Sequence, residues 1–408
     1  MRPALLLLII CLQSPLFSYA QNSDAILQYA NELMAEKEYG LAIQQFELAD
    51  DVDHGNIHAK IGIAEALYCL KNYTDALDIL ENLGAIGSYP TADYVKAQVY
   101  FKIGNYSKAR ALFQSSITRE ILDDELPYLI AVCNYQLGQL NSAVTGLHEF
   151  QITNLDHAYS FYYLGQSYLE LDSLGLAKSA AIRSTELDEL VPRMWRGLAD
   201  VDYAMGDLDA AIMHYGSALS LNPGYREARL RRGIAYHENG IYGLAKSDLE
   251  QATKNNSRDE LALNTLLDCY YALNEYDSFL AIVDRLFKID PGASELLFKR
   301  GYMHFANGQF EAAIDDFEIL ADLYPEDKSI HHQLGNCHAQ KKGYPRAIHH
   351  YKIASEGDMA IEESKYNLAV ILYESERLPE ACELWKYLIE NAQNELIKSN
   401  SEKYNLEF

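Results

Sequence analysis

The sequence is short of proline, of cysteine and of positive charge, and each shortage excludes a class of protein. Only 10 of the 408 residues are proline, which favours long helices because proline interrupts the helical hydrogen bonds. The 34 Lys and Arg are outnumbered by 59 Asp and Glu, for a net charge of −25. This balance excludes nucleic acid as a partner and argues against docking on anionic lipid, since both need a positive surface. An apolar share of 49% suffices for a folded core.

The cysteines are too few and too irregularly spaced to form a disulfide or metal framework. No two of them form a Cys-x-x-Cys pair, and the odd number left after residue 20 favours small buried side chains. Those five are Cys69, Cys133, Cys269, Cys337 and Cys382. The chain also lacks a glycine-rich phosphate loop, a His-Glu-x-x-His motif and a Gly-x-Ser-x-Gly motif. We therefore expect no catalytic residue, no metal and no cofactor, and predict that the protein is not an enzyme.

Residues 1–20 are predicted to be a signal peptide. Arg2 supplies a positive start, residues 4–12 form an unbroken apolar run, and Ala20 is a small residue before the cleavage point. The run is too short for a membrane span, which needs about 20 residues. Two alternatives remain, a retained membrane helix and a lipoprotein signal at Cys11, although a bulky residue precedes that cysteine. We expect an exported protein of the bacterial periplasm or cell surface, without stable membrane insertion.

A period of 34 residues tiles the chain from Ser23 to Glu395. An alanine recurs at this spacing in every unit but one, where Phe279 replaces it. A second series, twelve residues earlier, is Gly or Ala in every unit but the same one, which has Leu267. The two series define eleven units, called repeats 1 to 11, which begin at Ser23, Ile57, Pro90, Asp124, Ala158, Pro192, Arg226, Glu260, Ser294, Lys328 and Glu362.

Each repeat is predicted to be two helices joined by a turn. Apolar residues recur at spacings of three and four, which is helical periodicity. Pairs such as Gly104-Asn105 and Gly206-Asp207 mark the turn, and Pro223, Pro291 and Pro325 end repeats. The paired small residues let two helix backbones approach closely. We expect one all-α domain over 23–395, followed by a short tail or cap at 396–408.

This repeat resembles the tetratricopeptide repeat. Repeat 6 shows the resemblance through Trp195, Leu198, Ala199, Ala211, Tyr215, Ala218 and Pro223, and repeat 9 through Gly301, Phe310, Ala313, Phe317 and Pro325. The place of Trp195 departs from the family in other repeats, where it is often polar or aliphatic. The resemblance implies a right-handed α-solenoid whose first helices line a concave groove for a partner.

Aromatic residues recur on the first helices, where that groove is expected. One equivalent place holds Tyr68, Phe101, Tyr135, Tyr203, Tyr271, Phe305 and Tyr373, and a second holds Tyr94, Tyr128, Tyr162, Phe298 and Tyr366. Either these side chains pack between repeats, or they form an aromatic surface that suits an extended peptide, a partner helix or a carbohydrate. The predicted function is a non-catalytic scaffold or adaptor for a protein or peptide of unknown identity. The alternative is an envelope module that binds glycan or peptidoglycan.

Arg193 and Arg196 are the candidate charged residues of the groove. They are predicted to hold a partner's carboxylate or, alternatively, to form structural ion pairs with Asp200, Asp202 or Glu227. The histidines gather late in the chain, at His304, His331, His332, His338, His349 and His350. Their spacing is poor for a metal site. His304 and His338 fall at a packing position of the repeat and are expected to be buried or half-buried.

Two local departures yield further expectations. Repeat 8 has large residues, Leu267 and Phe279, at two places that are otherwise small and packed together. Either small neighbours compensate, or the helices lie wider apart at a bend or hinge, because one large residue alone would overpack the pair. In the last repeat, Trp385 and Leu388 are expected to be partly exposed, since the tail is short for a cap. This suggests a homodimer through the C-terminal repeat.

Overall fold

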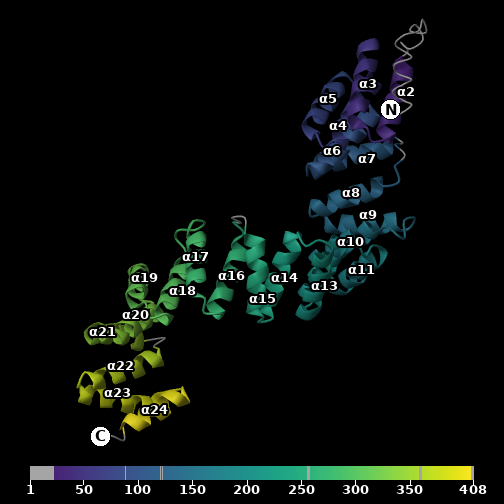
Figure 1. Cartoon of the computed structure of the whole chain (residues 1–408). Helices are drawn as coiled ribbons and strands as arrows, with labels where there is room; N and C mark the ends of the chain where they lie inside the picture. The colour runs from purple at the N-terminus through teal and green to yellow at the C-terminus, as the bar shows by residue number, and fades with distance from the viewer. Residues whose placement is uncertain are drawn as a thin grey trace. The chain divides into compact units, whose positions relative to one another are not determined.

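The computed structural model describes residues 23–405, except 88, 120, 122, 255–257 and 358–360, and leaves the side chains of 85 and 86 undescribed. The predicted signal peptide at 1–20 lies outside the described residues. Within them the secondary structure is helices joined by turns, with no strand, and consecutive helices pair along the chain (Figure 1). The chain is therefore an all-α solenoid of tandem helix pairs, as predicted.

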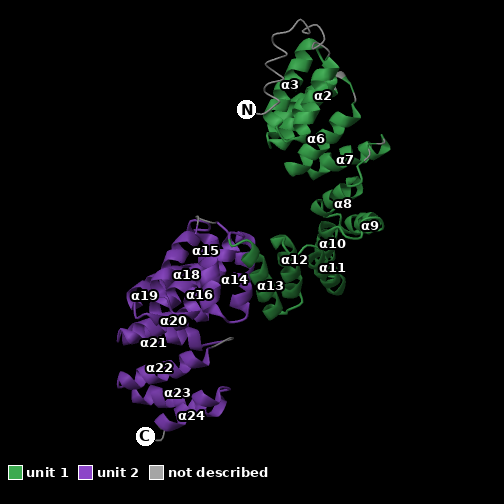
Figure 2. Ribbon diagram, turned by 45° about the vertical axis from the view of Figure 1, so that its right-hand side comes forward, with its two compact units in different colours: residues 1–223 green, residues 224–408 purple. Residues whose placement is uncertain are grey.

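The helices fall into two compact units, residues 1–223 and 224–408 (Figure 2). Repeats 1 to 6 form the first unit with α2 (Ser23–Ala35), α3 (Tyr39–Val52), α4 (Ile57–Cys69), α5 (Tyr73–Ile86), α6 (Pro90–Lys102), α7 (Tyr106–Thr118), α8 (Leu126–Gln136), α9 (Leu140–Gln151), α10 (Ala158–Glu170), α11 (Leu174–Leu187), α12 (Pro192–Ala204) and α13 (Leu208–Leu221). Repeats 7 to 11 form the second with α14 (Arg226–Glu238), α15 (Tyr242–Thr253), α16 (Glu260–Ala272), α17 (Tyr276–Phe287), α18 (Ser294–Ala306), α19 (Phe310–Leu323), α20 (Lys328–Gln340), α21 (Tyr344–Ser355), α22 (Glu362–Glu374) and α23 (Leu378–Asn391), and α24 (Glu395–Asn405) follows them.

The predicted repeat starts coincide with helix starts, except in repeat 4. There α8 begins at Leu126 instead of Asp124. The Asp123 carboxylate accepts a hydrogen bond from the backbone N–H of Glu125 at 2.9 Å, which holds these residues in a turn before the helix. Pro127 then occupies the first turn of α8, where its missing N–H costs nothing.

Every repeat turns between its two helices through a residue with positive φ. Five of these residues are glycines, namely Gly104, Gly138, Gly206, Gly240 and Gly308, and six are Lys37, Lys71, Asp172, Asn274, Lys342 and Glu376. In repeat 2 the N–H of Lys71 donates to the carbonyl of Tyr68, and the N–H of Asn72 donates to that of Leu67, both at 2.9 Å. This pair of bonds satisfies the last carbonyls of the first helix.

Repeat 5 is the most closely packed helix pair described, and its small residues explain this. A Cβ added at Gly165 of α10 would lie 3.3 Å from the backbone nitrogen of Ala181 and 3.4 Å from the carbonyl oxygen of Ala177. Both of these residues are on α11. The repeat that lacks a bulky residue at position 181 therefore closes the space by bringing the two backbones together.

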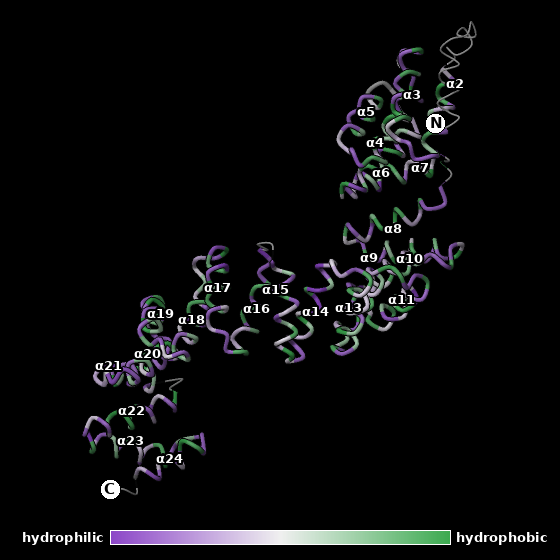
Figure 3. Tube along the Cα trace, viewed as in Figure 1, coloured by the Kyte–Doolittle hydropathy of each residue, from purple (hydrophilic) through white to green (hydrophobic). Residues whose placement is uncertain are grey.

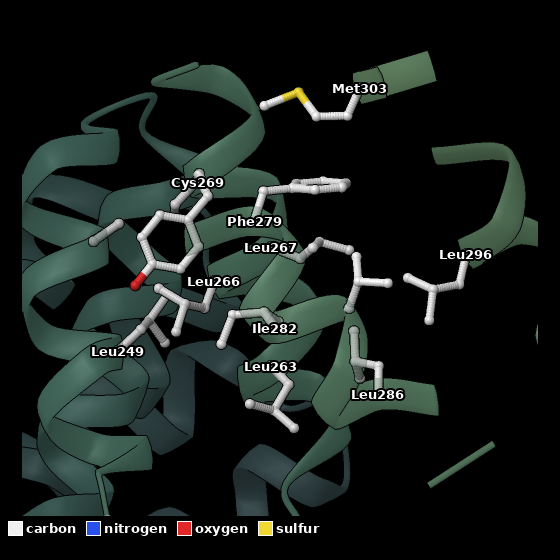
Figure 4. Close-up of a cluster of buried hydrophobic side chains, with 13 residues drawn as sticks. Leu249, Leu263, Leu266, Leu267, Cys269, Phe279, Ile282, Leu286, Leu296 and Met303 are labelled. Atoms are coloured by element: carbon white, nitrogen blue, oxygen red, sulfur yellow. The ribbon is translucent and has the colours of Figure 1, made fainter. Parts of the chain in front are cut away.

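Repeat 8 is the opposite case. Leu267 of α16 and Phe279 of α17 are both 0% exposed and point into one buried cluster with Leu296 and Met303 of α18 (Figure 4). The same cluster contains the large Leu263 and Leu286 and the small Ala245 and Cys269. The helices α16 and α17 contact each other less extensively than any other described pair of helices within one repeat. The hinge at this repeat stays a prediction.

The last repeat is covered by α24. Trp385 is 0% exposed and Leu388 is 1% exposed, so the prediction that they are partly exposed is wrong. The ring of Tyr404, from α24, stacks on Trp385 with a centroid distance of 4.9 Å and an angle of 9°, and Ile397 joins the same cluster. A short amphipathic helix therefore closes the exposed end of the array, which terminal repeats need.

Hydrophobic residues are distributed as short stripes along the helices (Figure 3). Within the described part of the chain, no helix is both long and apolar enough to cross a bilayer.

Candidate partner-binding surface

In each unit, the first helices of neighbouring repeats pack directly on one another. In the first unit α4 packs directly on α6, and α10 on both α8 and α12; in the second, α14 packs on α16, and α20 on both α18 and α22. The second helices of neighbouring repeats approach one another less closely. The surface that these first helices present to solvent is called the first-helix face. All the predicted aromatic residues lie on these helices.

Three predicted tyrosines gather around Tyr163 in the first unit. Its ring centroid lies 6.2 Å from that of Tyr128, 5.5 Å from that of Tyr135 and 5.1 Å from that of Tyr162. These four residues, with Arg193 and Arg196, are called the tyrosine–arginine cluster and come from α8, α10 and α12. Sequence reasoning missed Tyr163 because it lies one residue outside the repeating aromatic series.

Arg193 is the exposed cation of this cluster. It is hydrogen-bonded to Tyr163. Burial raises the pKa of Tyr128, Tyr162 and Tyr163, and the positive charge of Arg193 opposes each rise. The pKa of Tyr162 still reaches about 12, so the phenol stays protonated at neutral pH and can donate hydrogen bonds.

Arg196 faces the interior and is neutralised there. Its Nη1 lies 2.9 Å from Oδ2 of Asp200, and its Nη2 donates to the hydroxyl of Tyr162. The hydroxyl of Tyr215 donates to Oδ1 of the same aspartate at 2.6 Å. Arg196 and Asp200 are both buried, which agrees with the structural ion-pair interpretation for this arginine. Asp202 pairs with Lys178 and His214.

Several other aromatics of the first unit also serve packing. The Tyr135 hydroxyl donates to Oε1 of Glu170 at 2.7 Å, and the Tyr94 hydroxyl donates to Asp123. The ring of Phe101 packs edge-on against Tyr106, at 5.6 Å between centroids. In repeat 2, the ring of Tyr68 packs on that of Tyr73. Tyr203 is half-buried. The hydroxyls of Tyr94 and Tyr135 are thus bonded to carboxylates. The Tyr163 hydroxyl is bonded instead to the guanidinium of Arg193, which is exposed.

In the second unit most predicted aromatics are partly buried against a neighbouring ring. Phe298 packs on Phe317, Phe305 on Phe310 and Tyr373 on Trp385, with centroids 5.5 to 5.6 Å apart. Tyr366 is half-buried.

Tyr271 is the exception, because 46% of it is exposed. Its ring lies 6.0 Å from that of Tyr302, which is 37% exposed and which sequence reasoning missed. A hollow of about 360 Å³ lies farther along the same unit and is lined by Phe305, Asn336, Ala339, Gln340, Lys342, Tyr344, Tyr351, Asn367, Val370, Ile371 and Glu374.

Three other charged or titratable side chains of the second unit are half-buried. Arg232 of α14 forms a two-pronged bond to Asp248, at 2.6 and 2.9 Å, and Arg229 adds a contact at 3.6 Å. His304 lies between the hydroxyl of Tyr276, at 2.7 Å, and Asp316, at 3.8 Å. Among the described residues, no group of three or more His, Cys, Asp or Glu is arranged to hold a metal ion.

Comparison with known families matches two segments of the chain. A family described as TPR repeat matches residues 199–240, and one described as Tetratricopeptide repeat matches residues 298–360. Both segments follow the 34-residue period and the paired helices described above. The chain therefore contains tetratricopeptide repeats in these two segments.

Curated relatives are distant and mostly longer. Anaphase-promoting complex subunit CDC16 of Saccharomyces cerevisiae is 21% identical over 79% of this chain and 40% of its own length. Superkiller complex protein 3 of Mus musculus is 22% identical over 78% of this chain and 20% of its own length. BBSome complex member BBS4 of Bos taurus is 22% identical over 78% of this chain and 62% of its own length. The chain thus spans less than two thirds of each of these relatives.

Solved structures share the repeat type. The C-terminal part of a TPR repeat-containing protein from Cytophaga hutchinsonii is 20% identical and has a TM-score of 0.42, over 59% of this chain and 99% of its own. A tetratricopeptide repeat protein from Parabacteroides merdae is 19% identical and has a TM-score of 0.40, over 61% of this chain and 98% of its own.

Proposed function

We propose that the protein is an exported scaffold that binds a protein partner on its first-helix face, with the tyrosine–arginine cluster as the anchor. The carrying observation is the setting of Arg193. It is an exposed cation beside Tyr128, Tyr162 and Tyr163, in a chain with a net charge of −25. A positive site on an acidic surface attracts an acidic group of a partner, while the surrounding negative charge repels acidic groups elsewhere.

The chemistry of the cluster suits a carboxylate on an extended peptide. A guanidinium binds a carboxylate through two parallel hydrogen bonds, and the protonated phenols around it add donors and rigid apolar area. Arg196 supports the site from beneath, because its bond to the Tyr162 hydroxyl links α12 to α10 and its bond to Asp200 orients the guanidinium. Arg193 therefore contacts the partner, while Arg196 keeps the surrounding tyrosines in place.

The relatives support the general role. Three of them are named as members of assemblies, the anaphase-promoting, superkiller and BBSome complexes. Binding other proteins without catalysis is common to these repeats, and it extends to this chain as part of the proposal. The bacterial periplasm or cell surface is proposed as its compartment, on the pattern of residues 1–20. Fractionation of cells that produce the chain with and without residues 1–20 tests this, and an unchanged distribution would contradict it.

The binding site is tested by affinity purification from envelope extract with crosslinking. The partner recovered on the native protein is then measured against Arg193→Gln and Tyr163→Ala. We expect each to weaken binding by about tenfold or more, since hot-spot arginines and tyrosines contribute above 1 kcal/mol. Arg183→Gln is the matched control, because Arg183 is on α11, the second helix of repeat 5. Equal loss in the control, or recovery of glycan without protein, would overturn the proposal.

The homodimer through the last repeat also stays a proposal. Its exposed candidates are Tyr387 on α23 and Leu396 on α24. Sedimentation of the native protein and of Leu396→Glu tests it. A dimer that the substitution dissociates supports the interface, and a monomer at all concentrations contradicts it.

A further inference from the structure

Three repeats carry histidine at the same pair of facing positions, the eleventh and the twenty-third of the repeat. Repeat 6 pairs Asp202 with His214, their Oδ2 and Nδ1 atoms 2.6 Å apart. Repeat 9 pairs His304 with Asp316 at 3.8 Å. In both repeats, a carboxylate lies opposite the imidazole. Repeat 10 differs, because a second histidine takes the place of the carboxylate.

In repeat 10 the histidines form a stack between α20 and α21. The ring of His350 lies between those of His331 and His338, with centroids 5.3 and 5.6 Å away and planes inclined by 19° and 6°. His331 and His338 are buried, and His350 is half-buried. His349 meets His350 edge-on at 5.1 Å. Three imidazoles thus fill the space that an ion pair or apolar side chains fill in other repeats.

The hydrogen bonds of the stack cannot accommodate two charged rings, because the facing Nδ1 atoms of His331 and His350 share one proton. Nε2 of His331 lies 2.9 Å from the carbonyl oxygen of Pro325, which accepts only, so this nitrogen carries the proton. Nδ1 of His331 is then the acceptor for Nδ1–H of His350, 3.1 Å away. Charging both rings would place two N–H groups face to face. The tautomers follow from this network rather than from visible hydrogens.

The surrounding charges do not compensate. The groups that act most strongly on His350 are His331, His349, His338 and Arg346, and those acting on His338 are Arg346 and Lys341. Two carboxylates of the adjacent helices act on other groups. Glu311 of α19 lies 2.8 Å from Lys341, and Glu363 of α22 acts on His332, whose Nδ1 bonds to Ser364. Positive charge in the stack would therefore face positive groups.

We propose that repeat 10 is an acid-sensitive element in which the neutral histidine stack holds α20 on α21 and proton uptake separates the two helices. Burial lowers the pKa of His338, and burial with the neighbouring histidines lowers that of His350 to about 4. Because these values lie below the ordinary 6.5, the open state binds more protons, so the stability of the closed pair falls as the pH drops from about 6.5 toward 4. Burial also lowers the pKa of His214 and His304, but in repeats 6 and 9 a carboxylate instead of a second histidine faces the ring.

Opening would also change the hollow of the second unit, because α20 lines it through Asn336 and Gln340. This consequence rests on the proposed function, whereas the local opening does not. A failure of partner binding would leave the opening test unaffected.

The chain contains its own reporters for the test. Cys133, Cys269 and Cys337 occupy the tenth position of repeats 4, 8 and 10 and are each 0% exposed. Burial raises the pKa of each thiol to about 12, so their intrinsic chemistry is matched. Cys337 is adjacent to His338. Pulse labelling of the full chain with 4,4′-dithiodipyridine, followed by peptide mass spectrometry, gives the rate at each cysteine across pH.

We expect the labelling rate of Cys337, relative to Cys133 and Cys269, to rise about tenfold or more between about pH 7.5 and about pH 5. A ratio that stays constant with pH would overturn the proposal. An equal rise at all three cysteines would also overturn it, because that outcome is global unfolding.

Two variants assign the effect to the stack. His350→Asp gives repeat 10 the carboxylate that Asp316 supplies in repeat 9, and His350→Leu gives it the uncharged residue that Leu384 supplies in repeat 11. Both should lower the acid-induced rise at Cys337 to the level of the controls. Should one variant fail to fold, the other decides. Persistence of the full rise in a folded variant would overturn the proposal.

Discussion

Lys71 and Gly104 occupy the same place in adjacent repeats and share one backbone conformation, with φ of 64° and 80°. For a residue with a Cβ this left-handed conformation costs about 1–2 kcal/mol, whereas glycine adopts it freely. The period of the array demands the same turn in every repeat, so the six turns without glycine are strained and the five with glycine are not.

Lys71→Gly is therefore expected to stabilise the protein by about 1 kcal/mol, and Gly104→Ala to destabilise it by about the same amount. The shift in the midpoint of guanidinium unfolding measures both. Glu47→Gly, in the exposed interior of α3, is the control and should destabilise by about 1 kcal/mol. A neutral or destabilising Lys71→Gly would show that the turn stores no strain.

The turns also show where sequence reasoning succeeds and stops. The 34-residue period predicts the helix starts because two small residues, twelve positions apart, recur in nearly every repeat. They pack the first helix of the repeat against the second and so mark the same place in each. It places each turn only approximately, since Lys71 or Glu376 gives no local sign of positive φ. The helix α24 lies beyond the last repeat, so no period predicts that Tyr404 covers Trp385. Tyr163 was missed for the related reason that it lies one residue outside the register of the repeating aromatic series.

Gly165→Ala is expected to destabilise the protein by about 1–3 kcal/mol. The added methyl group would lie 3.3 Å from the backbone nitrogen of Ala181, and a helix backbone cannot move aside as a flexible side chain can. This exceeds the gain of about 1 kcal/mol that alanine brings to a helix. Gly175→Ala, on α11 with nothing within 4 Å of an added Cβ, should be neutral or stabilising. Equal midpoints of unfolding for the two variants would contradict the close-packing argument.

Asp200→Ala is expected to cost about 3–5 kcal/mol, because it leaves the buried guanidinium of Arg196 without its carboxylate. It also removes the acceptor of the Tyr215 hydroxyl. The exposed pair Arg183–Asp156, at 3.3 Å, is the comparison, and Asp156→Ala should cost less than about 1 kcal/mol. Chemical unfolding measures both. A small cost for Asp200→Ala would mean that the ion pair is dispensable and that α12 is held by apolar contacts alone.

Tyr404→Ala is expected to expose Trp385 and loosen the last repeat. The stacked rings contribute about 0.5–1.5 kcal/mol beyond the apolar area that Tyr404 covers. The chain has two tryptophans, so Trp195→Phe leaves Trp385 as the single fluorescent reporter. In that background Tyr404→Ala should shift the emission to longer wavelength and lower the unfolding midpoint. Glu402→Ala, exposed on the same helix, should change neither. An unshifted spectrum in Tyr404→Ala would mean that Ile397 and the rest of α24 cover Trp385 without the stacked ring.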